Sequence, residues 1–241
     1  MSAYKRLQHQ RIAACLENFN SDFLSQHTIL FGGGTRIALE FGEYRESVDI
    51  DFLCPDKAAY RAVRQQVTNQ SLGKLVQQDF HYSRDIIFDR YGVRTFIVAT
   101  GVPIKLEFVA FDNYQLEPDK AGTLFPVPYI NHASCFVTKL LANADRVGVK
   151  PYKDILDILV MYAHLGEIPQ AALDEAYSHY SKKVIDQSLQ KSLLQLTQNT
   201  AVYAEAAVGM GVDSHFFSRV ILPAAYKLLS EPAVTSSQSE R

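Results

Sequence analysis

The chain is poor in cysteine and carries none of the common zinc motifs. Its 241 residues include three cysteines, Cys15, Cys54 and Cys135, which are odd in number and widely spaced. This usage argues against a disulfide framework and favours a reducing compartment. No CxxC or HExxH motif occurs, and the seven histidines show no ligand spacing. A zinc site therefore has little support, and the histidines are expected to be structural or surface residues.

Long apolar runs are also missing. No stretch of about 18 apolar residues occurs, and the segment MSAYKRLQHQRIAACLENF lacks the apolar core of a signal peptide. We therefore expect a cytoplasmic protein without a membrane span.

The chain also lacks an excess of charge of one sign, because 24 basic and 26 acidic residues leave a formal net charge of only −2. A nucleic-acid partner would have to use a local basic patch. Two groups of basic residues are candidates, although such groups are usually only solvated surface: Lys5, Arg6 and Arg11, and separately Lys182 and Lys183.

Hydrophobic spacing predicts a first half of mixed helices and strands. Helices are predicted at 4–20, 35–43 and 56–78, and strands at 27–31, 48–53, 85–89, 93–100 and 103–111. Thr35 is the expected N-cap of the second helix and Gly42 its expected stop. Gly101 predicts a hairpin between the last two strands.

The second half is predicted to be helical. Helical spacing occurs at 133–146, 152–166, 168–183, 184–199 and 215–229, with a kink expected at Pro223. The fold class is thus α+β, a mixed sheet with flanking helices followed by a helical C-terminal bundle. The predicted organisation is a core at 1–128, a helical domain at 129–230 and a disordered tail at 231–241.

Acidic residues alternate with apolar ones in the segment VDIDFL, at 48–53, so Val48, Ile50 and Phe52 are expected to point to one side. In a strand, Asp49 and Asp51 project from one face, and their repulsion is relieved by a divalent cation such as magnesium, which prefers oxygen ligands. Taken alone, the pair is more commonly one solvated face of an edge strand. Glu107, inside the apolar strand PIKLEFVAF, adds a third acid. Together they describe a three-carboxylate metal site across neighbouring strands.

A run of glycines precedes this acidic segment. In GGGT, the bare backbone of Gly33 and Gly34 and the hydroxyl of Thr35 are suited to hold a phosphate at a helix N-terminus. The alternative is a tight turn that binds nothing. GxxxxGK[ST] is absent, and Ile37 stands where a dinucleotide fingerprint needs glycine.

The combined pattern resembles the nucleotidyltransferase superfamily of the DNA polymerase β type, and within it the AbiEii/AbiGii-type toxin family. The resemblance rests on GGGTRIALEFGEYRESVDIDF, on TKLLANADR with Lys139 and on YKDILDI with Asp154 and Asp157. It covers roughly residues 28–165. Glu107 departs from the superfamily, where aspartate is more usual at that place.

The resemblance implies an enzyme that moves a nucleotide from an NTP to an acceptor hydroxyl and releases pyrophosphate. Asp49, Asp51 and Glu107 would be catalytic and would hold two Mg²⁺ ions, with Mn²⁺ as an alternative. The residues implied to bind nucleotide are Gly33, Gly34, Thr35, Arg45, Ser47, Lys139, Asp154 and Asp157.

Several of these roles have structural alternatives. Arg45 is a candidate for a phosphate contact or for an ion pair with Glu43, and Ser47 for steadying the turn before the strand. Lys139 is implied at the leaving phosphates, although a snorkelling lysine is the simpler explanation outside the family. Asp154 and Asp157 share a helix face. They either contact the nucleotide or the acceptor, with Asp157 orienting Lys139, or form a structural polar network that fixes the helical half to the first half.

The implied acceptor is RNA such as tRNA, or protein, in a toxin–antitoxin or phage-defence setting with a cognate antitoxin. Two alternatives remain open. One is a small-molecule transferase of the aminoglycoside type, and the other is an inactive member that only binds nucleotide.

Overall fold

A computed structural model describes residues 4–231. It divides into two compact units, each with its own packing. The first comprises the described residues up to Glu43 together with Ser47–His132. The second comprises Tyr44–Glu46 and the described residues from Ala133 onward. The predicted disordered tail, 231–241, lies outside the described residues except for Glu231.

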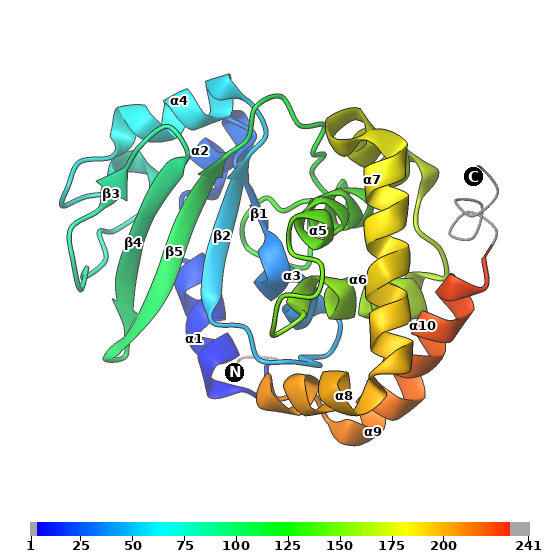
Figure 1. The fold of residues 1–241 in the computed structure, drawn as a ribbon. Helices are drawn as coiled ribbons and strands as arrows, with labels where there is room; N and C mark the ends of the chain where they lie inside the picture. Colours follow the sequence, from blue (N-terminus) through cyan, green and yellow to red (C-terminus); the bar gives the residue numbers. More distant parts are fainter. Residues whose placement is uncertain (1–3, 232–241) are drawn as a thin grey trace. The chain divides into compact units, whose positions relative to one another are not determined.

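The first unit is built on a five-stranded mixed sheet (Figure 1). Its strands are β1 (Leu30–Gly32), β2 (Asp49–Cys54), β3 (Ile87–Phe88), β4 (Gly92–Ala99) and β5 (Val102–Ala110), in the order β1-β2-β5-β4-β3. The pair β2–β5 is parallel, and the other neighbours are antiparallel. All five predicted strands form, and the α+β fold class is confirmed.

Four helices and one 3₁₀ turn accompany this sheet: α1 (Leu7–Leu16), α2 (Ser21–Gln26), α3 (Gly33–Glu40), α4 (Lys57–Gln66) and η1 (Gly73–Leu75). Alternate strand residues such as Ile50, Phe52 and Phe108 are fully buried in one core with Ile12 of α1 and Val63 of α4. On the opposite face of β2 and β5, the charged residues Asp49, Asp51, Lys105 and Glu107 are half-exposed.

The predicted hairpin joins β4 and β5. Thr100 and Gly101 have φ values of 46° and 78°, both in the left-handed region. This combination is the primed turn that matches the twist of a two-stranded ribbon, so the hairpin prediction is confirmed.

Three local predictions in this unit are wrong. The predicted helix 56–78 ends at Gln66, and Val67 is extended. Beyond it the Ser71 hydroxyl accepts a hydrogen bond from Gly73 N, a local bond of the kind that competes with helix formation. Thr35 is not an N-cap, because α3 begins at Gly33 with Gly32 as its N-cap. Val48 precedes β2 and is 45% exposed, so it does not share the buried face of Ile50.

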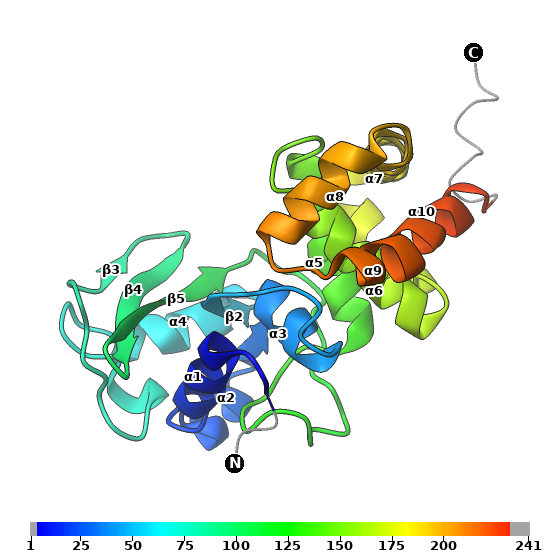
Figure 2. The ribbon, with the colours of Figure 1, turned by 90° about the horizontal axis from the view of Figure 1, so that it is seen from below.

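The second unit is helical (Figure 2). Its elements are α5 (His132–Asp145), α6 (Lys153–Leu165), α7 (Gln170–Gln198), α8 (Thr200–Gly209), α9 (Ser214–Phe216), the π-helical turn η2 (Phe217–Ile221) and α10 (Leu222–Leu229). The two helices predicted at 168–183 and 184–199 appear as α7, which is interrupted at Tyr180 and Ser181.

Two features of these helices relate directly to sequence. The irregularity expected at Pro223 takes the form of the π-helical turn just before it, where proline supplies no N–H. Helix α8 was not predicted. Its sequence TAVYAEAAVG is apolar around most of its circumference, with Tyr203 buried but Val202 and Val208 exposed, so it lacks a stripe.

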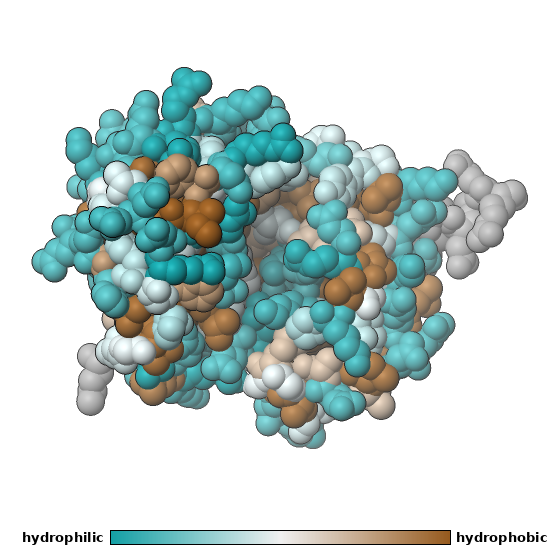
Figure 3. Space-filling model, turned by 60° about the vertical axis from the view of Figure 1, so that its left-hand side comes forward, coloured by the Kyte–Doolittle hydropathy of each residue, from teal (hydrophilic) through white to brown (hydrophobic). Residues whose placement is uncertain are grey.

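The described helices include none that combines the length and the apolar character needed to cross a membrane. On the face seen in Figure 3, hydrophilic residues predominate, and apolar residues form separate groups among them.

Candidate functional site

The three predicted acids project from one face of the sheet. Strands β2 and β5 are parallel and in register, with Asp49 opposite Lys105 and Asp51 opposite Glu107. Partners in adjacent strands point to the same side, and successive residues alternate. The intervening Ile50 is fully buried in the core. The carboxylates therefore share the half-exposed face, as the alternation of the sequence predicts.

The glycine turn lies beside these acids. Gly32 is paired with Asp51 across β1 and β2. Gly33 opens α3 with a φ of +69°, and a Cβ added there would lie 2.2 Å from Asp51 Oδ2. Only glycine suits both the backbone conformation and the closeness of the carboxylate. The turn and the acid pair are thus neighbours.

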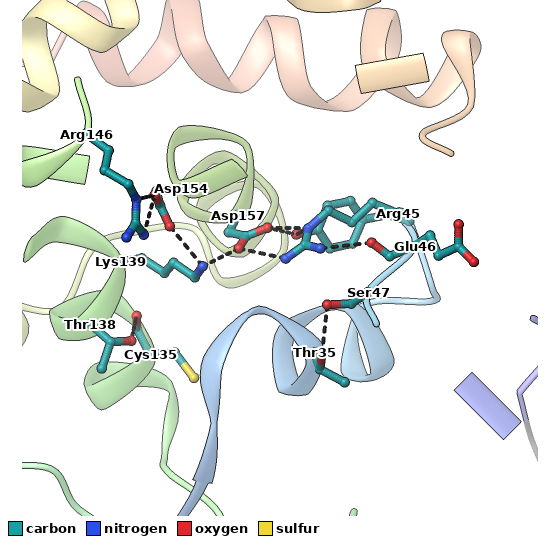
Figure 4. A network of polar contacts seen from close by, with 11 residues as sticks. Thr35, Arg45, Glu46, Ser47, Cys135, Thr138, Lys139, Arg146, Asp154 and Asp157 are labelled. Carbon is teal, nitrogen blue, oxygen red and sulfur yellow. Dashed lines mark hydrogen bonds and ion pairs between the residues drawn. The ribbon is translucent and has the colours of Figure 1, made fainter. Parts of the chain in front are cut away.

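The hydroxyls of Thr35 and Ser47 tie the turn to β2. Thr35 Oγ1 donates to Asp49 O at 2.5 Å and lies 2.7 Å from Ser47 Oγ (Figure 4). Thr35 is 1% exposed. Ser47 N donates in turn to Nε2 of the buried His9, at 3.0 Å. Thr35 and Ser47 therefore hold the backbone that presents Asp49, and the Thr35 hydroxyl is committed within the protein.

Lys105 is the cation of β2 and β5 on this face. Its Nζ lies 2.6 Å from Glu107 Oε2. Burial by itself lowers the pKa of Lys105, but Glu107, and then Asp49 and Asp51, outweigh burial and raise it. One ammonium thus stands among three carboxylates.

The donor set suits magnesium chemically, since all three side chains offer carboxylate oxygens. The described residues nevertheless contain no group of three His, Cys, Asp or Glu side chains placed to enclose a metal ion. Glu107 is instead directed to Lys105. Asp49, Asp51 and Glu107 therefore suit a divalent cation by donor type and by face, while the Glu107 carboxylate is paired with Lys105.

A second charged cluster lies within the helical unit (Figure 4). Asp157 of α6 receives Arg45 in a bidentate pair, Nε to Oδ1 at 2.7 Å and Nη2 to Oδ2 at 3.0 Å. Lys139 Nζ of α5 lies 2.6 Å from Asp157 Oδ2 and 3.0 Å from Asp154 Oδ1. Arg146 donates to Asp154 Oδ2 from Nε and Nη2, at 3.0 and 2.8 Å.

Burial and charge pairing set the pKa values of this cluster. Asp157 is 0% exposed, and burial alone would raise its pKa, but Arg45 and Lys139 outweigh burial and hold it well below the usual range. Burial would lower the pKa of Lys139, yet Asp157 and Asp154 raise it on balance. Both groups are therefore charged at neutral pH, and the ion pair between them agrees with the expectation that Asp157 orients Lys139.

Arg45 does not pair with Glu43, so that alternative is wrong. Glu43 accepts instead from the backbone N–H groups of Lys5 and Arg6, and it contacts His9 Nδ1 at 2.8 Å. Arg45 belongs with Asp157, and both Asp157 oxygens are occupied by protein cations.

Three residues of these clusters were not predicted as site residues: Lys105, Arg146 and Tyr44, whose hydroxyl donates to Asp157. Two carried a signal. Lys105 lies two residues from Glu107 in a strand, and Arg146 follows Lys139 by two helical turns in TKLLANADR. Tyr44 carried none, because its partner is 113 residues away.

Comparison with known protein families identifies a family that this chain matches over most of its length. A family model described as "Nucleotidyl transferase AbiEii toxin, Type IV TA system" matches residues 14–214. No curated protein sequence matches the chain.

Comparison with solved structures identifies proteins of similar fold. The crystal structure of a candidate nucleotidyltransferase from H. pylori has a TM-score of 0.51 at 14% identity, covering 95% of this chain and 96% of that one. JHP933 from Helicobacter pylori is 16% identical, covering 92% and 95%, with a TM-score of 0.48. The first of these likenesses shows a nucleotidyltransferase fold.

Proposed function

This chain belongs to the AbiEii family of nucleotidyl transferase toxins, and from that premise we propose that it transfers an NMP from an NTP to an acceptor hydroxyl in a metal-dependent reaction. One observation carries the proposal. Asp49, Asp51 and Glu107 share one half-exposed sheet face directly beside the glycine turn. That juxtaposition supports a site for a triphosphate and divalent metal.

Each residue of this face has a role in the proposed reaction. Asp49 and Asp51 would hold two Mg²⁺ ions, or Mn²⁺, and the backbone N–H groups at Gly33 and Gly34 would face the triphosphate oxygens. Bound metal supplies charge neutralisation and lowers the pKa of the acceptor hydroxyl. Glu107 would be the third ligand or the base.

The bond changes follow from this arrangement. The acceptor oxygen attacks the α-phosphorus as the bond to the bridging oxygen of the β-phosphate breaks, and pyrophosphate leaves. The hydroxyl proton passes to Glu107 if that residue is the base.

The second cluster has a different place in the proposal. Asp157 is fully buried and saturated by Arg45 and Lys139, which supports a structural role for all three. Thr35 and Ser47 position Asp49 rather than contact nucleotide. A contact between Lys139 and the leaving phosphates, implied by the resemblance, stays a prediction.

The acceptor and setting are proposed from the family. A type IV toxin–antitoxin context supports RNA such as tRNA, or a protein, as acceptor, a cognate antitoxin as partner and the cytoplasm as location. The described cysteines are all free and buried, which fits a reducing compartment.

The test is incubation of the full chain with each radiolabelled NTP, Mg²⁺ and total tRNA. Labelled RNA is the expected result, and label on a small molecule alone would favour an aminoglycoside-type enzyme. NTP binding without any transfer would favour an inactive member. Asp49→Asn with Asp51→Asn should abolish transfer. Asp112→Asn removes an exposed carboxylate that pairs with the exposed Lys57, and it should leave transfer unchanged. Transfer that survives the double change would overturn the site.

A further inference from the structure

Lys105 occupies a central place on the carboxylate face. It is the only cationic residue of β2 and β5, and it stands in register with Asp49 and two residues before Glu107. Its ammonium lies 2.6 Å from Glu107 Oε2, and the two side chains are 36% and 23% exposed. The pair is neither a fully solvated surface bridge nor a buried one.

The neighbouring strand offers Glu107 a second cation that is otherwise engaged. Arg94 of β4 lies opposite Glu107 in register, but its guanidinium donates to Asp89. Lys105 is therefore the group that sets the orientation of Glu107. This explains why three acids share a face while no three of the described carboxylates stand ready to enclose an ion.

We propose, building on the proposed function, that Lys105 is a positioning residue that holds Glu107 away from the metal site. A divalent cation bound by Asp49 and Asp51 must take Glu107 from Lys105 to gain its third carboxylate. The ammonium opposes the ion in two ways, because it occupies a ligand and repels positive charge. The free protein therefore binds metal weakly, and the nucleotide's own phosphate oxygens supply what is missing.

The test is metal binding by the full chain without nucleotide. Mn²⁺ is titrated into wild type, Lys105→Met and Lys105→Gln, and free Mn²⁺ is followed by its EPR signal. Removing one positive charge beside a doubly charged ion should tighten the Kd about tenfold in both variants. Lys57→Met neutralises the exposed partner of Asp112 and should change the Kd by less than about twofold.

The variant Glu107→Gln shows whether Lys105 weakens metal binding by holding Glu107 or by repelling the ion directly. If Lys105 acts by holding Glu107, Lys105→Met should bring a much smaller gain in the Glu107→Gln background than in wild type. An equal gain in both backgrounds would mean simple charge repulsion and would overturn the positioning role. An unchanged or weaker Kd in Lys105→Met and Lys105→Gln would overturn the inference as a whole.

The same titration separates this inference from the proposed function. Loss of Mn²⁺ binding in Asp49→Asn with Asp51→Asn places the ion at these carboxylates, and the Lys105 variants then decide the inference alone. If that double variant binds as wild type does, the proposed metal site is wrong. Absence of binding in wild type and in the Lys105 variants would overturn both.

Discussion

The two charged clusters of this protein differ in how their charges are compensated. On the sheet face, three carboxylates are accompanied by the single ammonium of Lys105, and all are half-exposed. In the helical unit, two carboxylates are matched by Arg45, Lys139 and Arg146, and Asp157 is fully buried. Unpaired charge is expensive in an interior, so the buried cluster must be balanced by the protein itself.

The contrast indicates which acids are available for chemistry. An accessible surplus of carboxylates can recruit a cation from solution, whereas a saturated buried carboxylate cannot. Asp49 and Asp51 should therefore matter for activity and little for stability, while the reverse holds for Asp157. Each prediction below tests this division, from the largest expected effect to the smallest.

Asp157→Asn should have the largest effect on stability. The substitution keeps the shape of the side chain but leaves Arg45 without its buried counter-ion and Lys139 with Asp154 alone, so the free energy of unfolding should fall by about 3 to 5 kcal/mol. Urea denaturation followed by circular dichroism measures this loss. Asp112→Asn is the control, since that exposed pair should contribute less than about 1 kcal/mol. Equal losses in the two variants would contradict the division.

Acid should weaken the same cluster. Because the net pKa shift of Asp157 is downward, its contribution to stability is fully present above the ordinary aspartate pKa of about 3.9. The contribution is lost as pH falls from there toward the folded-state pKa. Urea midpoints measured from about pH 6 down to about pH 2.5 should fall less steeply for Asp157→Asn than for wild type. Parallel slopes would argue against a charged Asp157.

Gly33→Ala should cost about 2 to 4 kcal/mol, because the new Cβ meets Asp51 and alanine is strained at positive φ. Gly42→Ala provides the matched control. Its φ is +73°, but nothing lies within 4 Å of the added Cβ, so only the backbone cost of about 1 to 2 kcal/mol applies. Thermal unfolding of both variants measures the difference in stability. Equal losses of stability would mean that the added Cβ at position 33 does not clash with Asp51.

Thr35→Val should cost about 1 to 2 kcal/mol, because it removes the buried hydroxyl that donates to Asp49 O and contacts Ser47. Thr138→Val is the control. Its hydroxyl makes only a local bond to Cys135 O within α5, and the loss should be under about 1 kcal/mol. The comparison uses urea denaturation, and a control as costly as Thr35→Val would exclude a special role for that hydroxyl.

Asp49→Asn should have the smallest effect on stability. Removing one of several like charges relieves repulsion, so the free energy of unfolding should stay within about 0.5 kcal/mol of wild type or rise slightly. Nucleotide transfer should be lost. A large destabilisation measured in urea would show that Asp49 belongs to the structural class, with Asp157.

Local patterns were sufficient for the carboxylate face. The alternation in VDIDFL and PIKLEFVAF predicted strands with acids on one side, and the parallel pairing of β2 with β5 brought the two sides together. The turn at Gly33 was equally readable, because glycine is the residue for positive φ. The helix predicted at 56–78 was too long because buried apolar residues beyond Gln66, such as Leu72 and Leu75, are not α-helical.

The buried network was harder to predict. Arg45 and Asp157 are 112 residues apart, and no local spacing shows that a residue just before a strand pairs with a distant helix. The resemblance drew attention to Lys139, Asp154 and Asp157, but only the contacts separate a structural role from a substrate contact. Helix α8 was not predicted because a short apolar helix without a polar face lacks the alternation of apolar and polar residues that indicates a helix.

The grouping of Tyr44–Glu46 with the helical unit has a consequence for synthesis on the ribosome. Arg45 is synthesised long before Asp157. In the nascent chain its guanidinium therefore has no contact with Asp157 until α6 has been made. Translation of the second half alone would yield a bundle in which Asp157 and Lys139 lack Arg45. Fragments split after residue 132 should consequently be poor folders separately and should regain order when they are mixed.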